Sequence, residues 1–254
     1  MSDPVAVITG GSRGIGAIIA RLMAERGSDV VINYRAKSAR AHDVATQIEQ
    51  IGRRSLAIQA DLSIPTEIAA MAEQIRSTFG RVDYLILNAA GGLERDRDEA
   101  YAFALNVTAN SLLVDELSPI MRPGSSIVYV TSHPSHFYGR MPIMSGYHRV
   151  ASTKHAAEEM LRSRISELEA VGIRLLVVSG DIIEGTINAR LMQREYPNLL
   201  DKRAQEVGPL PTVEEFGLAI ADAAMDGALA SGSTILIGST SWDTYSELYA
   251  QEMS

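Results

Sequence analysis

The sequence of 254 residues contains no cysteine. This absence excludes disulfides, thiolate metal ligands and a cysteine nucleophile, and it suits a reducing cytoplasm. Lysine is scarce too, since only Lys37, Lys154 and Lys202 occur among the 23 basic residues. Acidic residues number 31, which gives a formal net charge of −8. A nucleic-acid-binding protein is usually basic, so the composition argues against that class.

Long apolar runs are missing as well. No stretch approaches the roughly 18 apolar residues of a membrane-spanning helix, and no basic region precedes the first apolar segment after Met1–Pro4. We therefore expect a cytoplasmic protein without a signal peptide or membrane partner. Hydrophobic residues make up 46 % and charged residues 21 %, which predicts a globular chain with a substantial core.

Short apolar runs alternate with helical patterns along the chain. Strands are expected at 5–9, 30–32, 55–60, 83–87, 126–130, 173–178 and 234–237. Helices are expected at about 15–26, 39–51, 65–80, 97–120, 147–170 and 213–229. This alternation predicts an α/β fold, with one doubly wound parallel sheet of about seven strands covered by helices on both faces. We read a single domain spanning residues 1–254.

Two long segments interrupt this rhythm, at 133–148 and 181–211. Loops longer than about 12–15 residues in a compact domain are often functional. Both segments follow strands at their carboxyl ends, where ligands bind in such sheets. We expect the second one, the lid segment (181–211), to cover a substrate.

A glycine-rich segment, Thr9-Gly10-Gly11-Ser12-Arg13-Gly14-Ile15-Gly16, separates the first strand from the first helix. Gly10 can make the tight turn, Gly14 allows the backbone to approach a pyrophosphate, and Gly16 lets the helix lie close to the sheet. Such a loop alone is weak evidence. Its position between the first strand and a helix favours a dinucleotide site.

Several segments together resemble the short-chain dehydrogenase/reductase family over nearly the whole chain. The glycine segment fits the family pattern T-G-x3-G-x-G, and five further positions match: Asp61-Leu62, Asn88-Ala89, Asn106, Ser132 and Lys154. The resemblance implies a Rossmann-like fold and an oxidoreductase that moves a hydride between a nicotinamide cofactor and a ketone or alcohol. It also implies catalytic roles for Asn106, Ser132 and Lys154, together with a tyrosine.

The end of the second strand bears on the choice of cofactor. NAD-binding sites place a carboxylate there to accept from the ribose 2′-hydroxyl, whereas this chain has Asn33-Tyr34-Arg35. Arg35 and Arg13 could instead pair with a 2′-phosphate, so we predict NADP(H), and we expect Arg35→Ala to weaken NADPH more than NADH. The predicted cofactor contacts are Gly10, Ser12, Arg13, Gly14, Ile15, Gly16, Tyr34, Arg35, Asp61, Leu62, Asn88, Ala89, Lys154 and Ile182.

The catalytic pattern departs from the family at one place. Its tyrosine precedes the lysine by four residues, but Val150 occupies that position and Tyr147 precedes Lys154 by seven. Four residues rise about 6 Å along a helix and seven about 10.5 Å, on nearly the same face. Tyr147 therefore reaches the site only if the helix starts late or the backbone at 146–147 bends inward. The spacing therefore predicts that Tyr147→Phe, which removes this hydroxyl, has only a small effect on kcat.

The proton donor therefore stays open at this stage. Tyr147 completes the predicted catalytic set with Asn106, Ser132 and Lys154. A histidine of the 133–148 segment, a water or a substrate hydroxyl could serve instead. The histidines concerned are His133, His136 and His148.

We predict an NADPH-dependent carbonyl reductase for a bulky apolar or aromatic ketone, by analogy with polyketide-type ketoreductases. The alternatives are an alcohol dehydrogenase working oxidatively and a non-catalytic dinucleotide-binding regulator, for which Ser132 would be superfluous. No metal is expected. The helices at 97–120 and 147–170 resemble the family's dimer-forming pair, so we expect a homodimer or homotetramer. Apolar residues are expected to line the substrate pocket: Met141, Ile143, Met144, Ile187, Leu191, Met192, Tyr196 and Leu199.

Overall fold

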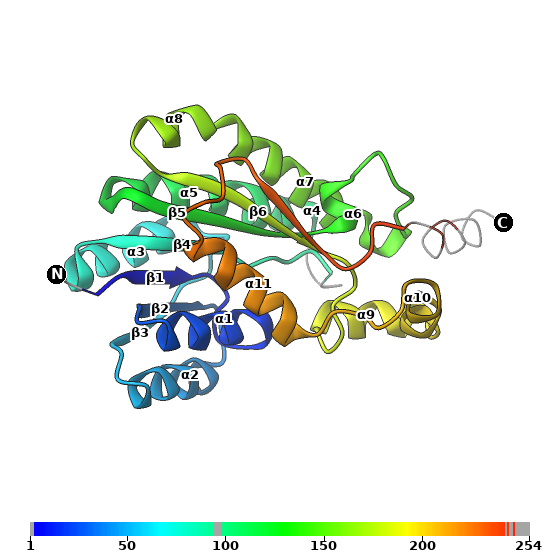
Figure 1. The fold of residues 1–254 in the computed structure, drawn as a ribbon, viewed down its shortest axis with the longest axis horizontal. Helices are drawn as coiled ribbons and strands as arrows, with labels where there is room; N and C mark the ends of the chain where they lie inside the picture. The colour runs from blue at the N-terminus through cyan, green and yellow to red at the C-terminus, as the bar shows by residue number, and fades with distance from the viewer. Residues whose placement is uncertain (1–2, 94–97, 242, 244–245, 247–254) are drawn as a thin grey trace.

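The computed structural model describes residues 3–93, 98–241, 243 and 246. One parallel sheet runs through it in the order β3-β2-β1-β4-β5-β6-β7, as Figure 1 shows. This confirms the predicted sheet. Its strands are β1 (Val5–Ile8), β2 (Asp29–Tyr34), β3 (Ser55–Gln59), β4 (Val82–Leu87), β5 (Met121–Ser132), β6 (Arg174–Gly180) and β7 (Thr234–Ile237).

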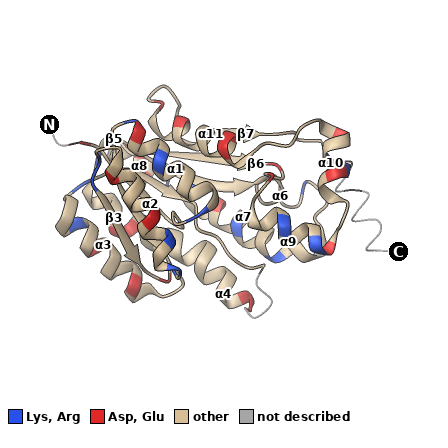
Figure 2. Cartoon of the chain, turned by 90° about the horizontal axis from the view of Figure 1, so that it is seen from below, with Lys and Arg blue, Asp and Glu red and all other residues tan. Residues whose placement is uncertain are grey.

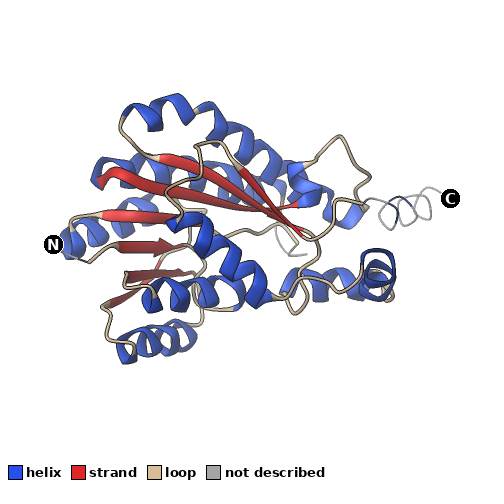
Figure 3. Ribbon diagram, in the orientation of Figure 1, coloured by secondary structure: helices blue, strands red, loops and turns tan. Residues whose placement is uncertain are grey.

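Helices cover both faces of the sheet, and each face has its own apolar cluster (Figure 3). One face carries α1 (Gly14–Glu25), α2 (Ser38–Gln50) and α11 (Val213–Met225). The other carries α3 (Pro65–Phe79), α5 (Ala109–Leu117), α7 (His148–Ser163) and α8 (Ile165–Ala170). The central strands are buried on both sides, which is why they read as continuous apolar runs. None of the described helices is long and apolar enough to cross a bilayer.

The helix expected at 97–120 is interrupted, and its expected first residue lies outside the described residues. It consists of α4 (Glu99–Phe103), a π-helical turn η1 (Ala104–Thr108), α5 and a short 3₁₀ turn η2 (Ser118–Ile120). Asp98 caps α4, because its side chain accepts from the Tyr101 backbone N–H at 2.8 Å. Single π turns inside helices are frequent at functional sites.

Both long segments contain helices that the sequence did not predict. The first holds α6 (His133–His136) and a 3₁₀ turn η3 (Ser145–Tyr147), which leads into α7. The lid segment holds α9 (Ile187–Glu195) and α10 (Leu199–Val207). Thr186 starts α9, since its hydroxyl accepts from the Ala189 N–H at 3.1 Å.

Candidate active site

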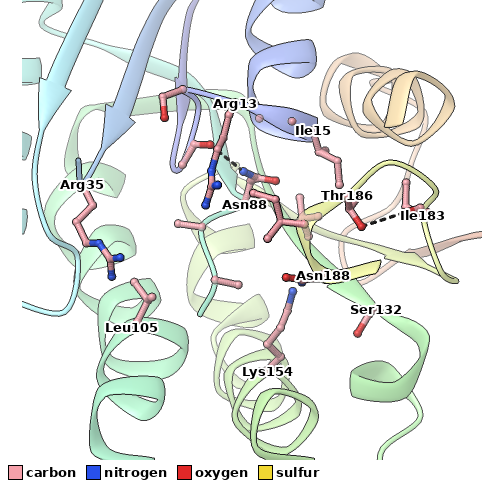
Figure 4. Close-up of a pocket in the computed structure, with 18 of the residues that line it drawn as sticks. Arg13, Ile15, Arg35, Asn88, Leu105, Ser132, Lys154, Ile183, Thr186 and Asn188 are labelled. Carbon is pink, nitrogen blue, oxygen red and sulfur yellow. Dashed lines mark hydrogen bonds between the residues drawn. The ribbon is translucent and has the colours of Figure 1, made fainter. Parts of the chain in front are cut away.

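A cavity of about 660 Å³ lies at the carboxyl ends of the strands, between the glycine segment and the lid segment (Figure 4). All predicted cofactor residues line it. Ser132, Tyr147 and Lys154 line it as well, whereas Asn106 does not. The parallel register of the sheet explains this convergence, because every strand ends at the same edge.

The glycine segment forms an open cradle at the start of α1. Gly10 and Gly14 have φ angles of +65° and +53°, which side chains rarely adopt. A Cβ on Gly16 would lie 2.4 Å from the Gly10 carbonyl oxygen, so only glycine allows this approach. Arg13, at the N-cap, gives the helix no side-chain cap, so the first amides of α1 remain available to an anion.

Four cationic side chains line one end of the cavity: Arg13, Arg35, Lys37 and Arg40. The described acids in the cavity lining are Asp61 and Asp181, and Asp181 is paired with Arg203. Asp29 lies at the opposite end of β2 and binds Arg54 at 2.7 Å, as its place in the sequence implied. Sequence reasoning missed Lys37 and Arg40, whose position depends on the chain turning after β2.

At the other end of the cavity, Tyr147 meets Ser132. The Tyr147 Oη lies 3.0 Å from Ser132 Oγ, and Ser135 Oγ lies 2.9 Å from Ser132 Oγ on its other side. The helix does start late, since Tyr147 ends η3 and α7 begins at His148. Val150, at the family's tyrosine position, is buried in an apolar cluster under the lid segment. Sequence reasoning missed Ser135, which the short helix α6 brings to Ser132.

Burial raises the pKa of Tyr147, while hydrogen bonds with Ser132 and Ser135 act in the opposite direction. The phenol is therefore protonated at neutral pH. A protonated hydroxyl beside Ser132 can donate a proton to an oxygen atom bound between them.

Lys154 points into the cavity from α7 (Figure 4). Burial lowers the pKa of Lys154 to about 8, and the Glu158 carboxylate one turn later opposes this shift. Glu158 is itself buried. Although burial favours its neutral form, hydrogen bonds from His136 and Arg162 hold the pKa of Glu158 below its ordinary value. The Lys154 amine is therefore mostly protonated at neutral pH, and the nearby Glu158 carboxylate favours this charge.

The Asn106 side chain serves the scaffold. It donates to the Gly91 carbonyl at 2.9 Å and to Thr153 Oγ1 at 2.9 Å, and it accepts from the Gly91 N–H at 3.1 Å. Its backbone carbonyl accepts from Asn110 at 2.6 Å. The π turn thus ties the segment after β4 to α7, and the catalytic role of Asn106 stays a prediction, since its side chain does not line the cavity.

The three candidate histidines also lie outside the cavity lining. His133 is fully buried and its Nδ1 lies 2.8 Å from Ser179 Oγ, while burial lowers its pKa to about 4. His136 binds Glu158 at 2.7 Å, and His148 meets the Tyr138 hydroxyl at 3.0 Å.

The lid segment contributes a mixed wall. Ile182 lines the cavity, and its N–H donates to the Asp181 carboxylate at 2.8 Å. Thr186 lines the cavity as well, whereas Glu184 is drawn away by a bridge to Thr212. Arg190 adds a charge to the wall, and Figure 2 shows basic residues on α9.

The predicted apolar pocket needs correction. Of the eight apolar residues expected to line it, Ile187 and Met192 do so. Others pack against one another in a cluster under the lid segment, where the buried members include Met141, Ile143, Met144 and Leu199. Their apolar character stabilises the lid segment instead of forming a wide substrate wall.

The comparisons with known proteins agree with this geometry. The chain matches the short chain dehydrogenase family over residues 4–196, and it belongs to that family. It is 29 % identical over 188 residues to 1-cyclohexenylcarbonyl-CoA reductase from Streptomyces collinus, which covers 71 % of this chain and 65 % of the relative. It is 34 % identical over 140 residues to hydroxynaphthalene reductase arp2 from Aspergillus fumigatus, which covers 52 % of this chain and 50 % of that relative.

Solved structures share the fold. L-sorbose reductase from Gluconobacter frateurii, complexed with NADPH and L-sorbose, superposes with a TM-score of 0.80 and 26 % identity. The match covers 94 % of this chain and 96 % of that one. The class of protein is therefore that of the short chain dehydrogenase family, with a Rossmann-like fold.

Proposed function

We propose that this chain is an NADPH-dependent carbonyl reductase in which Tyr147 supplies the proton. The observation that carries the proposal is the 3.0 Å contact between Tyr147 Oη and Ser132 Oγ in the cavity that also contains Lys154. The spacing between Tyr147 and Lys154 predicts a tyrosine that takes no part in the proton transfer. The late start of α7 and this contact support the opposite role.

The residues around the cavity fit a phosphorylated dinucleotide. The uncapped start of α1 suits a pyrophosphate, and the cations near β2 suit a 2′-phosphate. The NADPH complex of L-sorbose reductase supports the same choice. Arg13, Lys37 and Arg40 would hold the phosphate end, and Lys154 the nicotinamide ribose. When bound, NADPH supplies the hydride.

The protein groups would then handle the carbonyl oxygen. Ser132 donates a hydrogen bond to this oxygen, and Tyr147 delivers a proton to it as the negative charge develops. Ser135 keeps the Ser132 hydroxyl in place. Since burial raises the pKa of Tyr147, the phenol is protonated at neutral pH and can donate to the carbonyl oxygen.

We infer a ring ketone of moderate size as substrate. Pro134, Ile187 and Met192 line the same cavity as Ser132 and provide it with a limited apolar wall. The names of the two relatives, a cyclohexenylcarbonyl-CoA reductase and a hydroxynaphthalene reductase, support cyclic substrates. The analogy with polyketide-type ketoreductases remains part of this proposal.

Steady-state turnover tests the proposal. We expect the protein to oxidise NADPH with cyclic and aromatic ketones, with kcat/KM at least about tenfold higher than with NADH, which corresponds to about 1.4 kcal/mol. Lys154→Ala should reduce both turnover and cofactor affinity. Tight NADPH binding without turnover of any ketone would favour the non-catalytic regulator. Faster oxidation of the matching alcohols would favour the dehydrogenase.

A further inference from the structure

Arg35 reaches across the cavity edge to a residue of α4. Its Nη1 donates a hydrogen bond to the Tyr101 hydroxyl, and its Cζ lies 5.8 Å from the centre of the Tyr101 ring. The two residues are 66 positions apart and both line the cavity. Figure 4 shows Arg35 extending toward Leu105 on the neighbouring helix. The contact therefore connects the end of β2 with α4.

Both ends of this connection are anchored. The Arg35 carbonyl accepts from Gln59 on β3 at 3.1 Å. Tyr101 is 9 % exposed, and its backbone N–H is held by Asp98. The Tyr101 hydroxyl is thus presented from a fixed position, and it restricts a long side chain that would otherwise be free to rotate.

The neighbouring cationic side chains, unlike that of Arg35, are not held by another described residue. Within the described part of the chain, the side chains of Arg13, Lys37 and Arg40 have no hydrogen bond or ion pair with the protein, although they line the same end of the cavity. They are available to a phosphate group. The Arg35 guanidinium is held instead by Tyr101, and the apolar residues Leu62 and Leu105 line the same cavity.

We propose that Tyr101 is a positioning residue of the cofactor site, which holds the Arg35 guanidinium in place as a clamp on the adenine ring. A guanidinium packs favourably on an aromatic face, and a clamp on the base acts on both dinucleotides alike. The preference for NADPH over NADH then comes from Arg13, Lys37 and Arg40, which bind the 2′-phosphate. This inference rests on the proposed function only in assuming a dinucleotide cofactor, and it needs no turnover.

The assignment reverses the expectation drawn from the sequence for Arg35. A phosphate ligand would weaken NADPH selectively when removed. A base clamp weakens NADPH, NADH and 2′,5′-ADP by the same factor, because all three carry the adenine ring. Tyr101 should have an effect only while Arg35 is present.

Equilibrium binding to the full chain tests this. Dissociation constants for NADPH and NADH are measured by nicotinamide fluorescence, and for 2′,5′-ADP by competition, in wild type, Tyr101→Phe, Arg35→Ala and the double variant. We expect Tyr101→Phe to raise each Kd about three- to tenfold, as for the loss of a typical hydrogen bond. In the Arg35→Ala background the same change should alter Kd less than about twofold. Tyr84→Phe removes a hydroxyl outside the cavity lining and serves as the matched control.

Three results would overturn the inference: an unchanged Kd in Tyr101→Phe, an equal effect of Tyr101→Phe with and without Arg35, or a loss confined to NADPH and 2′,5′-ADP. Turnover at saturating NADPH checks that the variants are folded, since a positioning role raises the KM for NADPH and leaves kcat intact. A wild type that binds neither dinucleotide would refute both this inference and the proposed function. If wild-type binding and turnover are normal, failure here leaves the proposed function standing.

Discussion

Tyr147 occupies a place from which the helix alone could not deliver it to Ser132. The 3₁₀ turn before α7 changes the path of the backbone, so the hydroxyl arrives from a residue three positions earlier than usual.

We expect Tyr147→Phe to lower kcat by about 10²–10⁴-fold, the usual cost of removing a general acid, with the Kd of NADPH unchanged. Tyr138→Phe, which alters the same segment at an exposed hydroxyl, is the control for single-turnover measurements. A loss below about tenfold would assign the proton to water or to the substrate.

His133 gives a second test at the residue scale. Its folded pKa of about 4 lies below the ordinary 6.5, mainly because burial disfavours the charged ring. The unfolded chain therefore binds a proton first as the pH falls, so this residue reduces the free energy of unfolding between pH 6.5 and 4, by up to about 3 kcal/mol. Above pH 6.5 it contributes no pH dependence.

Urea unfolding at a series of pH values measures this slope. His133→Asn keeps a polar partner for Ser179 and removes the titrating ring, so the stability loss on acidification should shrink. An unchanged slope in the variant would assign the acid sensitivity to other groups.

At the scale of elements, the sequence predicted every strand of the sheet and the glycine cradle, because both depend on local patterns. It did not predict α9 or α10. Each has only nine residues, and Pro197 and Gly208 near their ends resemble loop signals. Likewise, an apolar residue such as Met144 looks the same in sequence whether it lines a pocket or packs under a lid.

Roles that depend on distant contacts were equally inaccessible. Ser135 matters through Ser132 and Tyr147, and Tyr101 through Arg35. Nothing in the spacing of these residues brings them together. The fold does so, by stacking strand ends and by the short turns that follow β5.

Two ion pairs made by Arg203 fasten the lid segment. The Arg203 guanidinium is fully buried, binds Asp181 at 2.7 Å and Glu206 at 2.8 Å, and donates to the Ser239 carbonyl at 3.1 Å. Arg203→Met leaves the Asp181 carboxylate buried without its partner charge, which should cost about 3–5 kcal/mol of stability. Thermal unfolding and limited proteolysis within 181–211 would measure the loss.

The matched control is the double variant Arg203→Met with Asp181→Leu. It removes both charges and should recover part of the stability, because a buried pair replaced by apolar groups is tolerated. A double variant as unstable as Arg203→Met alone would contradict this account.

For the whole molecule, we expect self-association through the face formed by α4, α5 and α7. Phe103 on α4 is 50 % exposed, which leaves a large aromatic side chain available to a partner surface. Light scattering at micromolar concentration should give two or four times the chain mass of 27.4 kDa. Phe103→Glu should shift the protein toward the monomer, because it would bury a charge in that interface. A wild-type mass of one chain would refute the expectation.

The contacts of Arg203 also bear on how a cofactor enters and leaves the cavity. Since α10 is fastened to the end of β6 and to the segment after β7, it is not the part that yields when a cofactor enters or leaves. The neighbouring helix α9 carries Ile187, Asn188 and Arg190 over the cavity, and it is flanked by Gly185, with a φ of +82°, and by Pro197. We therefore expect α9, rather than α10, to be displaced when a dinucleotide enters or leaves the cavity.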